Sequence, residues 1–148
     1  DLTSLLRESV ATLAPLALQK HQELALEADE SLQIQGQPTL LGLLFNNLID
    51  NAIRYTPEGG KILVSLAREG SQAVVYVRDS GPGVPAEEME HITEPFFRGE
   101  QAKKYPGGSG LGMSIVKHCV EACGGELHYY NQYPKGFTVS ITLKACDK

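Results

Sequence analysis

Features that mark membrane-spanning or secreted proteins are absent from this sequence. No apolar run approaches the roughly 18 residues that a bilayer-spanning helix needs. The first residues, Asp1-Leu2-Thr3-Ser4, lack the charged and apolar regions of a signal peptide. We therefore expect the 148 residues as given to be soluble.

Cysteine is scarce, and the cysteines present do not form a disulfide framework. There are three, an odd number, and Cys119 and Cys123 stand four apart within a helical pattern, where they suit two small hydrophobic positions. The four histidines supply no spacing that would complete a zinc site. This usage favours a reducing compartment such as the cytoplasm.

Positive charge is also in short supply. Thirteen Lys and Arg stand against 18 Asp and Glu, which gives a net charge of −5. This balance argues against nucleic acid or an anionic membrane as the main partner, so any bound anion must be held locally. The pattern Gly-x-x-x-x-Gly-Lys-Ser/Thr is missing, which excludes a P-loop protein.

The hydrophobic pattern predicts one α/β or α+β domain, in which about three helices cover one face of a sheet. Residues 29–31 read as a turn between two short strands, and residues 69–71 and 134–136 are typical of hairpin turns. The expected helices are residues 4–20, 40–54 and 109–123, and the expected strands are residues 24–27, 32–35, 62–68, 73–78, 126–133 and 137–143.

The polar residues Asn46, Asn47, Asp50 and Asn51 interrupt the almost entirely apolar second helix. Asn47, Asn51 and Arg54 fall on one face of a helix. An amide oxygen there can complete the oxygen shell of Mg²⁺ beside phosphates, and a guanidinium can pair with a phosphate. The alternative is a buried amide network or a helix edge without ligand.

A glycine-rich turn follows the strand that ends near Arg78. In Asp79-Ser80-Gly81-Pro82-Gly83, the carboxylate could accept a hydrogen bond from an exocyclic amine such as that of adenine, while the glycines let a base approach the backbone. These residue types also form ordinary turns. The partial match to a dinucleotide fingerprint fails, because prolines intrude and no βαβ unit surrounds it.

Two further motifs lie in the long irregular stretch before the third helix. Gly108-Ser109-Gly110-Leu111-Gly112 opens that helix, where free N–H groups attract anions, although a flexible helix cap is the alternative. Phe96, Phe97 and the cations Arg98, Lys103 and Lys104 suit a hinged lid, or else a small hydrophobic cluster beside solvated charges.

Together these motifs closely resemble the catalytic ATP-binding domain of sensor histidine kinases, within the gyrase, Hsp90, histidine kinase and MutL superfamily. Residues 47–55 look like its N box, 79–83 its G1 box, 95–98 its F box and 108–112 its G2 box. The four occur in the family's order and spacing, and the resemblance covers essentially the whole chain. Each motif is weak or moderate alone, and the combination is highly specific.

The resemblance implies a two-layer α/β sandwich of the Bergerat type, with a mixed sheet of about five strands on about three helices and a mobile ATP lid. It implies that Asn51 binds Mg²⁺ and that Asn47 lines the phosphate end. Arg54 would meet a phosphate, and Arg98 would neutralise charge on the transferred phosphoryl group.

The same resemblance places ATP between the N-box helix and the lid. Asp79 would accept the hydrogen bond from the adenine amino group. The remaining residues implied to contact the nucleotide are Tyr55, Gly81, Gly83, Val84, Phe96, Lys103, Lys104, Gly108, Ser109, Gly110, Leu111 and Gly112.

Two positions depart from the family pattern. The family often carries Gly-Thr-x-Phe on a late strand, but here the stretch reads Gly136-Phe137-Thr138-Val139. Thr138 is shifted by one, which turns a strand side chain to the other face. In the ATPases of the superfamily a Glu stands where this chain has Asn47, and an amide cannot act as general base. Phosphoryl transfer to a protein therefore fits better than hydrolysis.

The phosphoacceptor is missing from these residues. None of the four histidines is followed by an acid, as the family's acceptor is. We expect residues 1–148 to be one catalytic domain, in which residues 1–20 continue a helix from an absent dimerisation domain and residues 93–109 form the ATP lid. The fragment would be monomeric and inactive in autophosphorylation.

The full-length protein is expected to be a homodimeric kinase anchored in the bacterial inner membrane, with this domain in the cytoplasm. It would phosphorylate its own histidine and pass the phosphoryl group to a response regulator. Two alternatives remain: a serine kinase of the anti-sigma-factor type, disfavoured by Asn47 and by the Phe96-Phe97 motif, and a degenerate scaffold that binds nucleotide without turnover.

Overall fold

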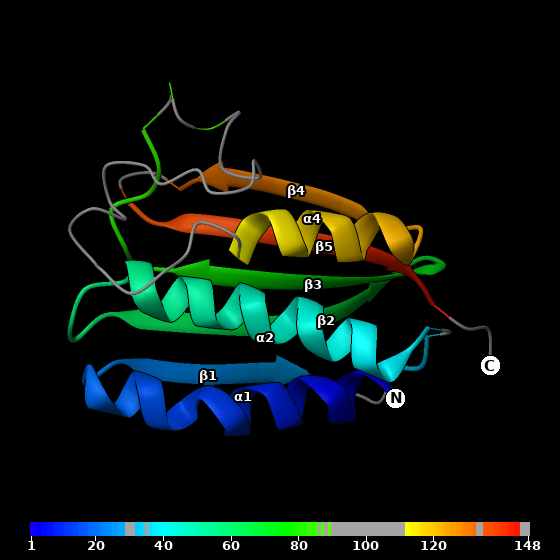
Figure 1. Cartoon of the computed structure of the whole chain (residues 1–148), viewed down its shortest axis with the longest axis horizontal. Helices are drawn as coiled ribbons and strands as arrows, with labels where there is room; N and C mark the ends of the chain where they lie inside the picture. Colours follow the sequence, from blue (N-terminus) through cyan, green and yellow to red (C-terminus); the bar gives the residue numbers. More distant parts are fainter. Residues whose placement is uncertain are drawn as a thin grey trace.

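The computed structural model describes residues 1–28, 32–34, 36–85, 87, 89, 112–132 and 135–145. The first described helix is followed by one strand, and the second and third described helices are each followed by two strands (Figure 1). In order they are α1 (Leu2–Gln19), β1 (Glu23–Ala28), α2 (Pro38–Tyr55), β2 (Lys61–Glu69), β3 (Gln72–Asp79), α4 (Gly112–Ala122), β4 (Glu126–Asn131) and β5 (Phe137–Lys144).

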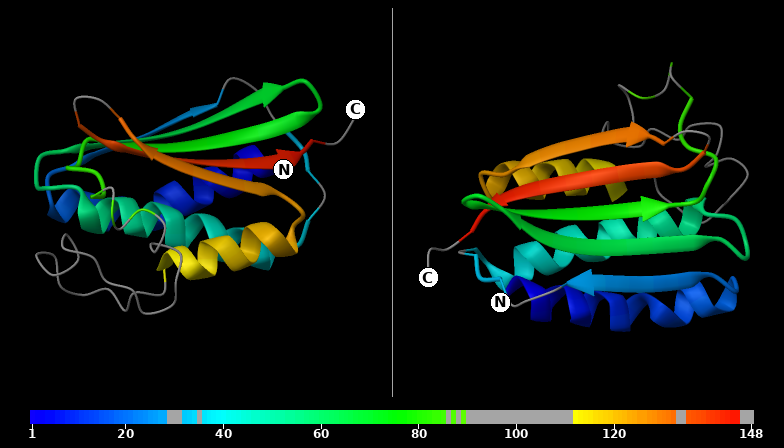
Figure 2. Two further views of the ribbon diagram at one scale, coloured as in Figure 1. Left: turned by 90° about the horizontal axis from the view of Figure 1, so that it is seen from above. Right: turned by 180° about the vertical axis from the view of Figure 1, so that it is seen from behind.

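The strands form one mixed sheet in the order β1-β2-β3-β5-β4. β1 runs parallel to β2, whereas β2–β3, β3–β5 and β5–β4 are antiparallel. The described helices all lie on one face of this sheet, and the other face is not covered by any of them (Figure 2). The expected two-layer α/β sandwich with about five strands is therefore confirmed.

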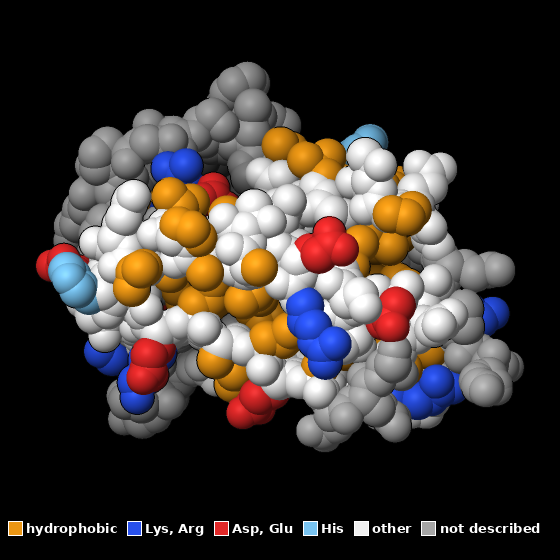
Figure 3. All heavy atoms as spheres, turned by 90° about the horizontal axis from the view of Figure 1, so that it is seen from below, with side chains coloured by type: hydrophobic (Ala, Val, Ile, Leu, Met, Phe, Trp, Pro, Cys, Tyr) orange, Lys and Arg blue, Asp and Glu red, His pale blue; other side chains and the backbone are white. Residues whose placement is uncertain are grey.

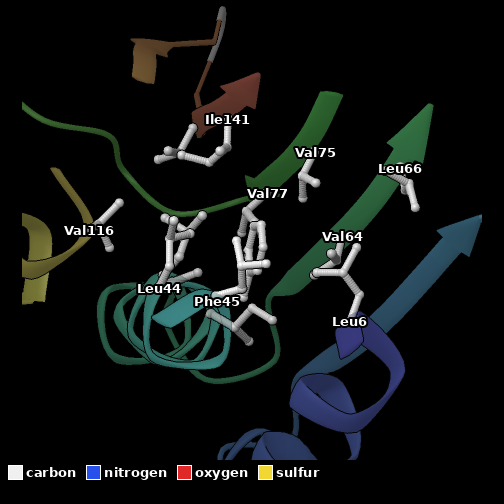
Figure 4. Close-up of a cluster of buried hydrophobic side chains, with 14 of the residues drawn as sticks. Leu6, Leu44, Phe45, Val64, Leu66, Val75, Val77, Val116 and Ile141 are labelled. Carbon is white, nitrogen blue, oxygen red and sulfur yellow. The ribbon is translucent and has the colours of Figure 1, made fainter. Parts of the chain in front are cut away.

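The core lies between the sheet and the helices because each strand alternates its side chains. On β3, Val75 and Val77 point toward the helices and are buried. Leu44 and Phe45 of α2 pack over them (Figure 4). The same close-up shows the other helices contributing Leu6 from α1 and Val116 from α4, with Val64, Leu66 and Ile141 from the sheet.

α1 buries one apolar face against the core, and it also exposes leucine side chains to solvent. Leu2, Leu6 and Leu13 lie in the core, while Leu16 and Leu18 are 40% and 73% exposed. Hydrophobic side chains accordingly reach the surface on this side of the molecule (Figure 3). The predicted helix over residues 4–20 is confirmed, with Asp1 as its N-cap.

The prediction of two paired strands over residues 24–27 and 32–35 is wrong. β1 pairs with β2 instead, with Leu24 opposite Ile62. Ile34 forms an isolated antiparallel bridge with Ala145. Alternation marks a segment as extended but does not identify its partner, and α2 provides the crossover that a parallel β1–β2 pair requires.

The other predicted elements are found with small shifts. The predicted start of the third helix at Ser109 lies outside the described residues, and α4 is described from Gly112. Cys119 and Cys123 are free thiols, and burial raises the pKa of both. Their interpretation as small hydrophobic positions is confirmed, because Cys119 is buried in the core and Cys123 packs against it.

Phe45→Ala should lower the free energy of unfolding by about 3 to 5 kcal/mol, because it leaves a cavity where a side chain with 0% exposure had filled the core. Urea denaturation measures this change. Leu43→Ala on the same helix is the matched control, since Leu43 is 48% exposed and should change stability far less. Equal losses in the two variants would contradict this description of the core.

Candidate functional site

The polar face of α2 carries the two asparagines and the arginine of the N-box motif. α2 is continuous from Pro38 to Tyr55, so Asn47, Asn51 and Arg54 lie on successive turns. The Asn47 Nδ2 donates to the carbonyl of Leu43 at 2.8 Å, which leaves its Oδ1 available as an acceptor. Within the described part of the chain, no hydrogen bond is recorded for the Asn51 side chain.

The half-buried amide of Asn51 suits a hard cation. Mg²⁺ prefers oxygen ligands and is usually held by one or two protein groups together with phosphate oxygens. The described residues contain no group of three His, Cys, Asp or Glu side chains that could hold a metal by themselves. A cation at Asn51 would therefore need oxygen ligands from a bound nucleotide.

Arg54 is held by a neighbour to which the sequence motifs gave no role. Its Nε donates to the Oδ2 of Asp50 at 2.9 Å, and both side chains are partly exposed. The terminal nitrogens of the guanidinium remain for another acceptor. The i, i+4 spacing of Asp50 and Arg54 is the signal that could have predicted this pair.

Asp79 ends β3 with its side chain toward the helices, on the same face as Val77. In the sheet it lies between Ile62 on β2 and Phe137 on β5. Its Oδ1 accepts a hydrogen bond from the N–H of Gly81 at 2.9 Å. Burial raises its pKa from 3.8 to about 6, against the opposing effect of the N–H groups of Gly81 and Phe137.

Both glycines of the G1 motif are required by close contacts. A Cβ on Gly81 would lie 2.9 Å from the carbonyl oxygen of Tyr55, so the turn after β3 rests directly on the end of α2. Gly83 has a φ of +85°, and a Cβ there would come within 2.5 Å of the Oδ1 of Asn131. The two glycines therefore allow the backbone after Asp79 to pass close to the end of α2 and to Asn131.

Asn131, at the end of β4, is a site residue that the sequence analysis missed. Its Oδ1 accepts from the N–H of Val84 at 2.8 Å, and its Nδ2 donates to the carbonyl of Val84 at 2.7 Å. This pair of hydrogen bonds holds the backbone of Val84, one of the residues that the resemblance implies to contact the nucleotide. No local signal predicts it, because the two residues are 47 positions apart.

Phe137 occupies the position next to Asp79 on β5. It is the in-register partner of Asp79, and its ring lies 6.3 Å from that of Tyr129. Thr138 is paired with Arg78 and therefore faces the opposite side of the sheet. It is fully buried there. The one-residue shift thus turns the hydroxyl of Thr138 away from Asp79, as the sequence predicts.

The remaining predicted site residues fall into two groups. Tyr55 is the last residue of α2, and Gly112 is the first of α4, which packs beside α2. The start of α4 lies toward the same end of the molecule as the ends of α2 and β3 (Figure 1). Outside the described residues lie Phe96, Arg98, Lys103, Lys104, Gly108, Ser109, Gly110, Leu111 and the predicted lid over residues 93–109.

Replacing Asp79 by Asn should stabilise the nucleotide-free domain in a pH-dependent way. Below the unfolded pKa of 3.8, the wild-type carboxyl is protonated in both the folded and the unfolded state. As the pH rises through about 6, the carboxyl ionises in the folded state, and the free energy of unfolding falls. The difference between 3.8 and about 6 corresponds to about 3 kcal/mol. Asp79→Asn should therefore raise the free energy of unfolding at about pH 8 and have little effect at about pH 4.

Urea denaturation across this pH range checks the expectation. Glu121→Gln removes an exposed carboxylate from α4 and should reproduce the wild-type profile. A difference between Asp79→Asn and wild type that stays constant with pH would contradict the buried position of this carboxyl.

Comparison with known proteins agrees with this geometry. Residues 36–146 match the family described as the histidine kinase-, DNA gyrase B- and HSP90-like ATPases. The sensor-like histidine kinase SenX3 of Mycobacterium tuberculosis is 33% identical over 146 residues, which cover 98% of this chain and 36% of SenX3. The chain thus spans about a third of the length of this relative. None of the described helices is long and apolar enough to cross a membrane.

Solved structures lead to the same family. The mycobacterial sensor histidine kinase MprB superposes with a TM-score of 0.86 at 29% identity, covering 100% of this chain and 97% of that one. Histidine kinase ThkA in complex with the response regulator protein TrrA gives 0.82 at 27% identity, covering 99% and 41%. The chain therefore belongs to the histidine kinase-, DNA gyrase B- and HSP90-like ATPase family and is a catalytic ATPase domain of the sensor histidine kinase kind.

Proposed function

We propose that this domain binds Mg²⁺-ATP and delivers the γ-phosphoryl group to a histidine on a dimerisation domain outside these residues. Membership of the ATPase family implies ATP binding. The observation that carries the proposal is the half-buried carboxylate of Asp79, which accepts the N–H of Gly81 at the end of β3, next to the end of α2. A buried carboxylate lowers stability when ionised, so its presence favours a role in binding.

Asp79 accounts for the choice of base. Its Oδ1 already accepts from Gly81, and the carboxylate has further acceptor capacity for the amino group of adenine. Guanine carries a carbonyl at that place and would face the carboxylate with a second acceptor. Val84, held by Asn131, would form an apolar wall of this pocket, and Tyr55 would pack near the adenine.

The phosphate end would be assembled along the polar face of α2. Asn51 would contribute an oxygen to Mg²⁺, Asn47 would line the phosphates, and the free nitrogens of Arg54 would contact one of them. Lys103 and Lys104 would reach the phosphates, and Gly108, Ser109, Gly110, Leu111 and Gly112 would cradle them at the expected start of the third helix.

The transfer step needs positioning and charge neutralisation more than a general base. The bond from the γ-phosphorus to the bridging oxygen breaks, a phosphorus–nitrogen bond forms to the acceptor imidazole, and ADP leaves. An imidazole is a competent nucleophile, so Asn47 has no proton to remove. Arg98 would neutralise the developing charge, and Phe96 would anchor the lid over residues 93–109.

The acceptor and the partners would be supplied by the rest of a longer protein. Residues 1–148 would form one domain, with residues 1–20 continuing from the dimerisation helices. The whole protein would be a membrane-anchored homodimer with this domain in the cytoplasm, and it would pass the phosphoryl group to a response regulator, as the complex of ThkA with TrrA suggests. By itself the fragment would be monomeric and would not autophosphorylate.

Calorimetric titration with a non-hydrolysable ATP analogue tests the binding part of the proposal. The domain should bind the analogue more tightly with Mg²⁺ than without it, and should bind the corresponding GTP analogue much more weakly. Labelled ATP added to the domain together with its separate histidine-bearing portion tests transfer. A folded sample that binds neither nucleotide, or both equally, would contradict the assignment of Asp79.

Two variants should separate base recognition from metal binding. Asp79→Asn should weaken adenine binding by about 1 to 3 kcal/mol, since the amide can present a donor to the adenine amino group. Asn51→Ala should instead remove most of the dependence of affinity on Mg²⁺. The same titrations measure both effects. Gln19→Ala, which changes an exposed amide on α1, is the control and should bind like wild type.

A further inference from the structure

The turn between α1 and β1 caps the C-terminal end of α2. The Lys20 Nζ donates to the carbonyls of Ile53 at 2.8 Å and Arg54 at 3.2 Å. The Gln22 Nε2 donates to the carbonyls of Ile53 at 3.1 Å and Thr56 at 2.7 Å. The last carbonyls of a helix have no partner within the helix, so these two side chains supply the missing donors.

This end of α2 is also the surface on which the nucleotide-binding turn rests. The Cβ position of Gly81 lies 2.9 Å from the carbonyl oxygen of Tyr55 and 3.5 Å from the Cα of Thr56. The N–H of Gly81 in turn donates to Asp79. A shift of Tyr55 and Thr56 would therefore move the turn that orients the carboxylate.

The turn is fixed to α1 on its other side. The backbone N–H groups of Lys20 and Gln22 both donate to the carbonyl of Ala17, which is in the last turn of α1. The carbonyl of Lys20 accepts from Gly59, in the loop after α2. The ends of α1, α2 and β3 lie at the same end of the molecule (Figure 1). Hydrogen bonds thus connect α1 to the end of α2, and the close packing of Gly81 on Tyr55 continues this connection to the turn that holds Asp79.

The capping side chains carry a cost as well as a gain in stability. Gln22 is only 7% exposed, and among the described residues its Oε1 is buried without a hydrogen-bond partner. This unpaired acceptor offsets part of the stabilisation that the two donated hydrogen bonds provide. Burial and the neighbouring charge of Arg54 lower the pKa of Lys20, so the ammonium is also placed at some cost.

We propose that Lys20 and Gln22 are positioning residues of the nucleotide site, which hold the end of α2 against the Asp79–Gly81 turn and thereby contribute to nucleotide affinity. The inference rests on the proposed function and adds two residues that act on the site through α2.

Lys20→Met and Gln22→Met test the proposal in the 148-residue chain. Each should raise the Kd for the Mg²⁺-loaded ATP analogue about fivefold while the protein remains folded. Lys20→Arg keeps donors for the two carbonyls and should recover most of the affinity. Lys61→Met is the matched control. The Lys61 side chain is 76% exposed, and its Nζ lies 4.0 Å from the Oε2 of Glu23, which is also exposed.

A second readout needs no nucleotide. The backbone amide resonance of Gly81 should shift in Lys20→Met and Gln22→Met and stay in place in Lys61→Met. If Gln22→Met does not fold, Gln22→Asn, which shortens the side chain by one methylene, takes its place. A lower free energy of unfolding with unchanged Kd and unchanged Gly81 resonance would show a purely structural cap and overturn the inference.

The two proposals fail in different ways. A wild-type chain that folds but binds no ATP analogue contradicts the proposed function, and with it the positioning role of both residues. A wild-type chain that binds, with variants that bind equally well, overturns only the positioning role of Lys20 and Gln22.

Discussion

The division of α2 into a buried and a polar face is the constraint on which the rest of the structure depends. Leu44, Phe45 and Leu48 are at most 1% exposed and lock the helix against the sheet. Because the side chains of a helix are fixed relative to one another, this packing also sets the direction of Asn47 and Asn51. The buried face and the polar face that carries Asn47 and Asn51 are therefore specified by the same eighteen residues.

Asp79 shows the corresponding constraint in the sheet. Its side chain faces the helices only because β3 pairs with β2 and β5 in one register, and a slip of one residue would turn it to the uncovered face. A buried carboxyl whose pKa is raised to about 6 weakens the free domain near neutral pH. A residue that lowers the stability of the free domain in this way is typical of binding sites.

Much of the fold could be predicted because its signals are local. Alternation marked the β2–β3 and β4–β5 hairpins, and Asp79, Gly81 and Gly83 follow a strand in recognisable spacing. The partner of β1 could not be predicted, since a parallel pair across α2 leaves no local pattern. Asn131 was missed for the same reason: its contact with Val84 joins segments far apart in the sequence. Lys20 and Gln22 likewise reach across to the end of α2.

The pairing of β3 with β5 has a consequence for folding kinetics. The two hairpins join neighbouring segments and close quickly, whereas Asp79 and Phe137 meet only after a long stretch of chain has been brought together. The Asp79 carboxylate is thus expected to acquire its surroundings late, when the two halves of the sheet dock. Partly folded chains would lack these surroundings. A nucleotide bound as proposed would therefore stabilise only the fully folded domain.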